Sequence, residues 1–215
     1  MSKRFVQDWS MERKPPLKDR VTAAINPVPL RQKITKTIFN LSRVQKKLET
    51  SHTRMEQKEK SIFNKCVKAQ QAKNSLSAAM YANECAEIRK MTKSIVMGQL
   101  ALEQVVLRLE TVKDFGDVAV EAVPALNVIR SVSTHLSGIF PEISYQLGSI
   151  GSELNNLILE VGGTTGISWD VVSSGEEAEK ILEEAMTVAG QKMKERFPEL
   201  PVSTPEPDLE REMKP

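Results

Sequence analysis

The sequence has few aromatic residues, few cysteines and no long apolar segment. Only 5 % of its 215 residues are aromatic, and Cys66 and Cys85 are its two cysteines. They do not form a C-x-x-C pair, which argues against a zinc site and is typical of a reducing compartment; we expect both to be buried as small hydrophobic residues. The most apolar stretch, 94–109, is interrupted by polar and charged side chains. No segment is therefore expected to span a membrane, and no secretory signal is visible at the N-terminus.

Side chains that carry out catalysis or bind metal are equally scarce. His52 and His135 stand apart from other candidate ligands, and no set of His, Cys and carboxylate residues shows metal-ligand spacing. The glycine-rich stretch 162–166 lacks the Lys-Ser/Thr pair of a phosphate-binding loop. We therefore expect no enzymatic activity, no metal, no cofactor and no small-molecule substrate.

Charge, in contrast, is plentiful and divided between the two halves of the chain. Residues 1–90 contain 20 Lys and Arg against 8 Asp and Glu, a net charge of +12, whereas residues 91–215 contain 10 against 20, a net charge of −10. A basic half can bind an anionic surface such as phosphate or acidic lipid. The acidic half can fold back over it or meet the basic half of another copy, and a head-to-tail contact that does not close makes a filament. The alternative is two solvated helical surfaces of unequal charge.

The hydrophobic pattern indicates long helices. An apolar residue recurs every seven positions from residue 34 to residue 76, whereas the companion positions are mostly polar. One such seam is too narrow for a self-sufficient dimeric coiled coil and fits a long helix laid against another helix. Asn74 and Ser75, which disfavour helix, are the local signal for a reversal within 71–77. The sequence thus predicts an all-α fold built on a long antiparallel helical hairpin. The seam consists of Ile34, Leu41, Leu48, Met55, Ile62, Ala69 and Leu76.

Prolines and glycines divide the chain into segments. Pro15-Pro16 and the stretch 26–29 interrupt the chain before the long helices begin. A joint follows at 114–117, and Pro141 opens another helix. The expected segments are an amphipathic N-terminal anchor and linker at 1–29, a helical core at 30–161 with its hairpin at about 30–113, a flexible linker at 162–175, an amphipathic helix at 176–196, and a disordered tail at 197–215.

Two basic regions are candidate membrane-binding surfaces. In the N-terminal segment, a helix would place Phe5 and Trp9 on one face beside Val6, with basic residues on either side, a pattern that suits insertion at an anionic bilayer interface. The alternative is that these aromatic residues pack on a neighbouring helix. The basic residues of this segment are Lys3, Arg4, Arg13 and Lys14.

The first long helix carries a second basic face. It could bind lipid headgroups, nucleic acid or an acidic helix, or it could simply be solvated. No aromatic residues are interleaved for base stacking, which weakens the nucleic-acid interpretation. The face comprises Arg31, Lys33, Lys36, Arg43, Lys46, Lys47, Arg54, Lys58 and Lys60, and the first six of these are the candidate membrane-binding residues.

The C-terminal part offers two further candidate surfaces. The final helix has an apolar face, and the tail alternates proline with apolar residues, which favours an extended backbone that can lie in a groove between helices of a partner. The alternative for the tail is a disordered solubilising segment. The helix face comprises Ile181, Leu182, Ala185, Met186 and Ala189. The tail residues are Leu200, Pro201, Val202 and Pro205.

A basic hairpin, acidic later helices, a linker, a late amphipathic helix and a Pro-rich tail together resemble the ESCRT-III (Snf7/CHMP) family. The stretch YANECAEIRKMTKSIVMGQLALEQVVLRLETV, 81–112, is similar to the second core helix of the archaeal cell-division CdvB paralogues. The resemblance spans about 30–196 and supports the reversal placed near 71–77. It implies five core helices. In the closed form the fifth helix folds against the hairpin; in the open polymer the second and third helices fuse and the fifth crosses to a neighbouring subunit.

The same resemblance implies partners and location. The apolar face of the final helix would join subunits of a homo- or heteropolymer with other CdvB paralogues. The tail would bind the MIT domain of a Vps4-like (CdvC) AAA+ ATPase. The polymer would lie on the inner face of the plasma membrane at the division site, bound to anionic lipids and not to nucleic acid, and would drive constriction or scission. The rival interpretations are a basic helical nucleic-acid-binding protein and a soluble helical scaffold.

Overall fold

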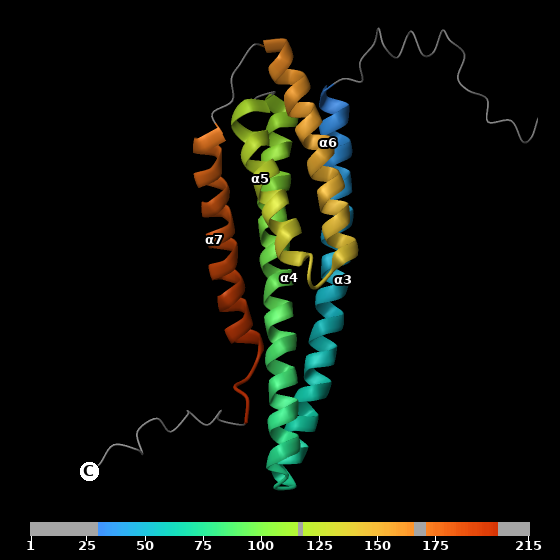
Figure 1. Cartoon of the computed structure of the whole chain (residues 1–215), viewed down its shortest axis with the longest axis vertical. Coiled ribbons are helices and arrows are strands. Elements are labelled where there is room, and N and C mark those ends of the chain that lie inside the picture. The colour runs from blue at the N-terminus through green and yellow to red at the C-terminus, as the bar shows by residue number, and fades with distance from the viewer. Residues whose placement is uncertain (1–29, 116–117, 166–170, 202–215) are drawn as a thin grey trace, which may run out of the picture.

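The chain folds into long helices that lie roughly side by side (Figure 1). The computed structural model describes residues 30–115, 118–165 and 171–201, and in these ranges it contains five helices and no strand. The predicted all-α fold with a long helical hairpin is therefore confirmed. The helices are α3 (Leu30–Gln71), α4 (Ser75–Phe115), α5 (Val118–Leu136), α6 (Pro141–Thr165) and α7 (Val171–Arg196).

The hairpin reverses at residues 72–74, between α3 and α4, where the sequence predicted it. Lys73 adopts a left-handed backbone conformation with φ of 56°, which costs a non-glycine residue about 1–2 kcal/mol. Asn74 then caps α4, because its Oδ1 accepts a hydrogen bond of 3.1 Å from the N–H of Ser77. The N–H of Asn74 donates to the carbonyl of Ala69 at 3.0 Å, which satisfies the end of α3.

The seven-residue seam forms the contact between α3 and α4 over most of its length. Ile34, Leu41, Leu48 and Ile62 are buried. The seam fails at its last position, because Leu76 belongs to the first turn of α4 and is 75 % exposed.

Two of the companion positions are buried as well. Glu59 is buried although it is charged, and Cys66 is buried as expected. Cys66 donates from its thiol to the carbonyl of Ala78 at 3.4 Å. Both cysteines are free and buried, as predicted, and burial raises the pKa of the Cys85 thiol to about 11.

Helix α5 folds back along α4. Gly98 of α4 permits a close approach, since a Cβ there would lie 3.3 Å from Cγ1 of Val132. Nearer the other end of α5, Arg108 pairs with Glu121 at 2.9 Å. Pro141, which has no N–H to leave unpaired, opens α6, and the N–H of Ser144 donates to the carbonyl of Phe140 at 3.0 Å.

Helical backbone occupies much of the segment that was expected to be a linker. Helix α6 continues to Thr165 and α7 already begins at Val171, so only 166–170 lie between them, outside the described residues. Each glycine in a helix costs only about 1 kcal/mol relative to alanine. A pair of glycines is therefore a weaker stop signal than the sequence suggested.

Helix α7 returns along α4 and α5 and completes the core. Its Ala178, Ile181, Ala185 and Ala189 are buried in one cluster with residues of the other four helices. The three shorter helices cover one half of the hairpin, and the hairpin tip projects beyond them (Figure 1).

Candidate binding surfaces

The predicted basic face of α3 lies against α6, whose glutamates neutralise part of it. Three ion pairs join the two helices across the surface. All six side chains are at least partly exposed, so each pair is screened by solvent. The hydrogen bond from Lys47 lowers the pKa of the Glu142 carboxyl. The pairs are Lys33–Glu160 at 2.5 Å, Lys36–Glu153 at 3.7 Å and Lys47–Glu142 at 2.7 Å.

The remaining candidate cations on α3 sit differently. Arg31 lies 3.9 Å from Asp114 at the far end of α4. Lys46 pairs with Glu49 of its own helix at 2.6 Å, and that hydrogen bond lowers the pKa of the Glu49 carboxyl. Arg43 has no ion pair within the described part of the chain.

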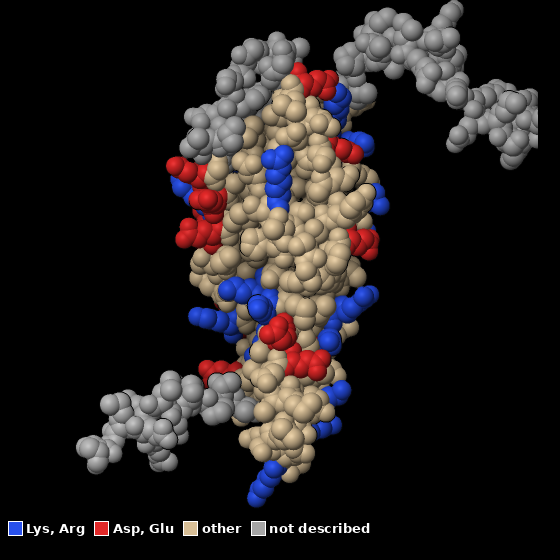
Figure 2. All heavy atoms as spheres, in the orientation of Figure 1, with Lys and Arg blue, Asp and Glu red and all other residues tan. Residues whose placement is uncertain are grey.

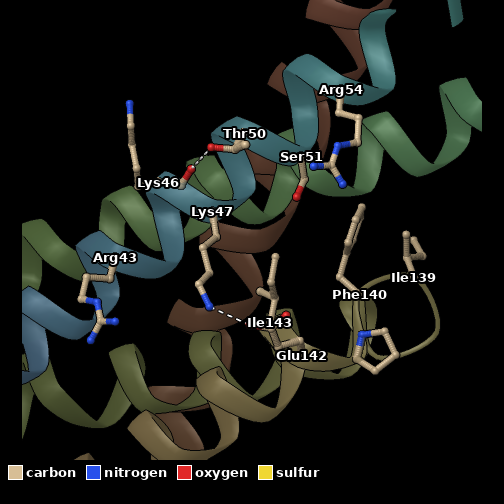
Figure 3. A pocket seen from close by; sticks show the side chains of 11 residues that line it. Arg43, Lys46, Lys47, Thr50, Ser51, Arg54, Ile139, Phe140, Glu142 and Ile143 are labelled. Atoms are coloured by element: carbon tan, nitrogen blue, oxygen red, sulfur yellow. Dashed lines mark hydrogen bonds and ion pairs between the residues drawn. The ribbon is translucent and has the colours of Figure 1, made fainter. Parts of the chain in front are cut away.

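A basic groove of about 670 Å³ opens between α3 and the connection from α5 to α6 (Figure 3). On one side stand Arg43, Lys47 and Arg54 with the hydroxyls of Thr50 and Ser51. Figure 3 shows Lys46 directed away from the groove and Lys47 reaching across it toward Glu142. The opposite wall is formed by Ile139, Phe140, Pro141, Glu142 and Ile143.

The groove brings cationic and apolar groups together. Arginine and lysine suit phosphate or carboxylate oxygens, while the ring of Phe140 offers a hydrophobic contact. Arg43, Lys46, Lys47 and Arg54 belong to the basic face that the sequence indicated on the first long helix, whereas Phe140 on the opposite wall was not predicted.

The predicted polymer-interface residues of α7 lie mostly inside this chain. Ile181, Ala185 and Ala189 are buried and Leu182 packs partly against the same core. Met186, in contrast, is 48 % exposed. In this arrangement the apolar face of α7 is therefore occupied by α4 and α5.

Beyond α7, the start of the tail is held on the hairpin by Arg89. The guanidinium of Arg89 donates from Nε to Glu59 at 2.7 Å and from Nη1 to the carbonyl of Pro198 at 2.7 Å. It also lies over the rings of Phe63 and Phe197, 5.8 and 5.1 Å from their centroids. Sequence reasoning missed this cluster, and the only signal was a charged Glu59 at an inward position of the heptad pattern.

The first residues of the predicted tail motif pack next to this cluster. Leu200 lies partly buried against Ile62, Cys85 and Ile88, and Arg196 forms an ion pair with Glu56. We call residues 196–200 with their hairpin contacts the tail clasp. Predicted sites outside the described residues are Lys3, Arg4, Phe5, Val6, Trp9, Arg13, Lys14, Val202 and Pro205.

The described ranges contain no group of three His, Cys, Asp or Glu residues placed to hold a metal ion. None of the helices in those ranges is both long enough and apolar enough to cross a bilayer. The described residues thus define a helical-hairpin protein with a basic groove and exposed apolar side chains.

Comparison with known proteins identifies the family. The chain is 39 % identical over 206 residues to Cell division protein B1 of Sulfolobus acidocaldarius, covering 94 % of this chain and 92 % of that protein. It is 32 % identical over 174 residues to Cell division protein B of the same organism, covering 81 % and 67 % of the two chains. No family profile and no solved structure matches it. The chain belongs to the CdvB-type ESCRT-III family.

Proposed function

We propose that this protein is a non-enzymatic ESCRT-III subunit of archaeal cell division that polymerises on the cytoplasmic face of the membrane and drives its constriction. A Vps4-like (CdvC) AAA+ ATPase would remodel the polymer. One observation carries the proposal beyond the family assignment. The basic face of α3 is neutralised within the chain by α6, through pairs such as Lys33–Glu160 and Lys47–Glu142. Exposed pairs of this kind can be exchanged for lipid phosphates at modest cost.

Membrane binding would use the α3 face and the N-terminal segment together. Arg43 and Arg54 line the groove without ion pairs in the described residues, so they are ready to contact phosphate. Each Lys or Arg held close to an anionic membrane contributes about 1 kcal/mol of binding free energy. Phe5 and Trp9 would add hydrophobic anchoring.

Polymerisation would use the apolar face of α7 after α7 leaves its own core. Ile181, Ala185 and Ala189 are buried here against α4 and α5 of their own chain. After release, the same side chains could pack against α4 and α5 of a neighbouring subunit, as in a domain swap. The separate, folded-back α5 fits the closed form that the family resemblance implies. Fusion of α4 with α5 would convert it to the open form.

ATPase recruitment would use the tail from Leu200 onward. Because Leu200 packs on the hairpin, the tail clasp would have to release before an MIT domain could bind the whole motif. Recruitment would then follow opening of the subunit.

Pelleting with vesicles tests the membrane role. We expect the variant Arg43→Glu/Lys46→Glu/Arg54→Glu to lose most of its binding to phosphatidylglycerol vesicles, because it reverses three cations while leaving the Lys47–Glu142 pair intact. The control Lys180→Glu/Lys192→Glu/Lys194→Glu changes the net charge equally on α7. Equal pelleting of the two variants would contradict the role of the α3 face. Binding of the wild-type chain to duplex DNA with a steep salt dependence, and not to vesicles, would favour the nucleic-acid alternative.

A further inference from the structure

The tip of the hairpin carries an apolar pair that no other part of the described chain covers. Leu76 and Met80 are 75 % and 64 % exposed. They are four residues apart in the first turns of α4, so both lie on one face, about 6 Å apart along the helix axis. Helices α5, α6 and α7 pack on the other half of the hairpin and leave this end bare (Figure 1).

The tip is also uniformly basic. Between residues 60 and 83 the chain has four lysines and no Asp or Glu. The flanking carboxylates are already engaged, since Glu59 pairs with Arg89 and Glu84 lies 3.3 Å from Lys58. Figure 2 shows the same end of the molecule with basic and uncharged side chains only. The lysines are Lys60, Lys65, Lys68 and Lys73, none of them in an ion pair within the described residues.

This combination fits an anionic bilayer better than a second protein copy. Two side chains at the end of a rod are too small a patch for a stable protein interface, which needs about 800 Å² from each partner. A bilayer needs only shallow burial, about 5–10 Å into the headgroup and acyl boundary, and lysine stems can extend along apolar surface while their ammonium groups stay among phosphates. Both requirements are met without any rearrangement of the hairpin.

We propose that the hairpin tip inserts Leu76 and Met80 into the interface of an anionic membrane, with Lys68 and Lys73 on lipid phosphates. The proposal rests on the proposed membrane-binding function and adds a second contact to it. Along α3, the groove at Lys47 is about 36 Å from the end of the helix at Gln71. Two contacts that far apart fix the direction of the rod on the membrane, which one contact cannot do.

A fluorophore at the tip tests the insertion in the full-length chain. Met80→Cys is labelled with an environment-sensitive dye, while Cys66 and Cys85 react slowly because they are buried. We expect a blue shift and brighter emission on phosphatidylglycerol vesicles, quenching by lipids with spin-labelled acyl chains, and no change on phosphatidylcholine vesicles. Leu107→Cys, exposed in the last third of α4 and far from the tip, is the matched control and should not respond.

A second pair of variants measures the contribution to binding. Leu76→Gln/Met80→Gln should weaken phosphatidylglycerol vesicle binding about tenfold or more, whereas Leu107→Gln/Leu159→Gln, at two other exposed positions, should not. An unresponsive dye at residue 80 in protein that pellets with vesicles would overturn the tip proposal alone. A dye response on assembly without lipid would assign the tip to a second copy instead. Failure of the wild-type chain to bind phosphatidylglycerol vesicles would overturn the proposed function as well.

Discussion

At the scale of single residues, Arg89 combines an ion pair, a hydrogen bond to the tail and contacts with two aromatic rings. It pairs with Glu59, whose side chain is 5 % exposed, at 2.6 Å, and it contacts the tail through Pro198 and Phe197. A buried ion pair contributes little net stability over a well-packed apolar pair, but the loss of one partner leaves an uncompensated charge. Arg89 is therefore required chiefly because Glu59 is buried.

We predict that Arg89→Ala lowers the free energy of unfolding by about 3–5 kcal/mol, because the Glu59 carboxylate is then buried without its partner. Urea unfolding followed by helical circular dichroism measures this. The double variant Arg89→Met/Glu59→Gln removes both charges and should recover much of the loss. Equal destabilisation by the single and double variants would show that packing, not charge, dominates at this site.

His52 gives the stability of the folded protein a pH dependence. Burial lowers the pKa of His52 below its usual value near 6.5, as do Arg196 and Lys192, while Glu56 acts in the opposite direction. The unfolded chain therefore binds more protons than the folded chain below that value, and stability is lost as pH falls through it. We expect wild-type protein to unfold at lower urea concentration at about pH 5.5 than at about pH 7.5. His52→Gln should reduce this difference, and an unchanged difference would assign the pH dependence to other groups.

At the scale of helices, α6 acts as a counter-charged cover for α3. The glutamates of α6 face lysines of α3 in an antiparallel register, from Lys33–Glu160 at one end to Lys47–Glu142 at the other. Any anionic membrane must compete with these carboxylates for the same cations. In the proposed membrane contact, the affinity for lipid would then be set partly by α6, a helix that need not touch lipid itself.

Neutralising that cover should strengthen membrane binding. We predict that Glu142→Gln/Glu153→Gln/Glu160→Gln raises the affinity for phosphatidylglycerol vesicles by about threefold to tenfold. Flotation over a range of lipid concentrations measures it. The control Glu87→Gln/Glu103→Gln/Glu110→Gln makes the same change in net charge on α4, where none of the three forms an ion pair within the described ranges. Equal gains in both variants would mean that net charge alone is responsible.

Two positions of α7 allow the fold and the proposed assembly to be tested separately. Ile181 is buried, whereas Met186 is 48 % exposed. We predict that Met186→Asp leaves the thermal unfolding of the subunit nearly unchanged but blocks filaments seen by negative-stain electron microscopy. Ile181→Asp should lower stability as well, because it buries a carboxylate in the core. Normal filaments of Met186→Asp would remove this position from the subunit interface.

The helices were predictable where one local signal dominates and unpredictable where distant residues decide. Asn74 and Ser75, which disfavour helix, predicted the reversal together with the family resemblance, and in the structure the Asn74 side chain caps α4. A charged residue such as Glu59 is usually expected in solvent. It is buried here because Arg89, thirty residues away in the sequence, neutralises its carboxylate and donates a hydrogen bond to it. The tail residue Leu200 was expected in a disordered segment, but it packs in a cluster formed by both hairpin helices. Composition does not reveal such a contact, since it depends on where α7 ends.

At the scale of the whole molecule, the basic and acidic halves of the sequence contact each other within one chain. In the described residues the basic half forms α3 and the start of α4, and acidic residues of α6 lie against it, as in Lys33–Glu160 at 2.5 Å and Lys36–Glu153 at 3.7 Å. The charge pattern allowed either contact within one chain or contact between copies. In this arrangement the acidic residues of α6 pair with basic residues of the same chain.

Two truncations of the tail should distinguish binding of the MIT domain from release of the tail clasp. We predict that deletion of 202–215 abolishes binding to the MIT domain while leaving the tail clasp intact, because Phe197 and Leu200 remain. Deletion of 197–215 should also abolish binding and, in addition, promote assembly by removing the clasp. Pull-down with the isolated MIT domain and light scattering measure the two effects. Retained MIT binding by either truncation would refute the tail motif.

The uneven covering of the hairpin has a mechanical consequence. One half of the rod is braced by three helices and a large core, whereas the other half is a two-helix ribbon around the small cluster of Ile62, Cys85 and Ile88. Local opening is easier where few apolar contacts are buried, so amide hydrogen exchange should be faster in the ribbon half. In a bent filament, elastic strain would then collect within each subunit, in its thin half, and the braced half would keep its shape while the polymer changes its radius.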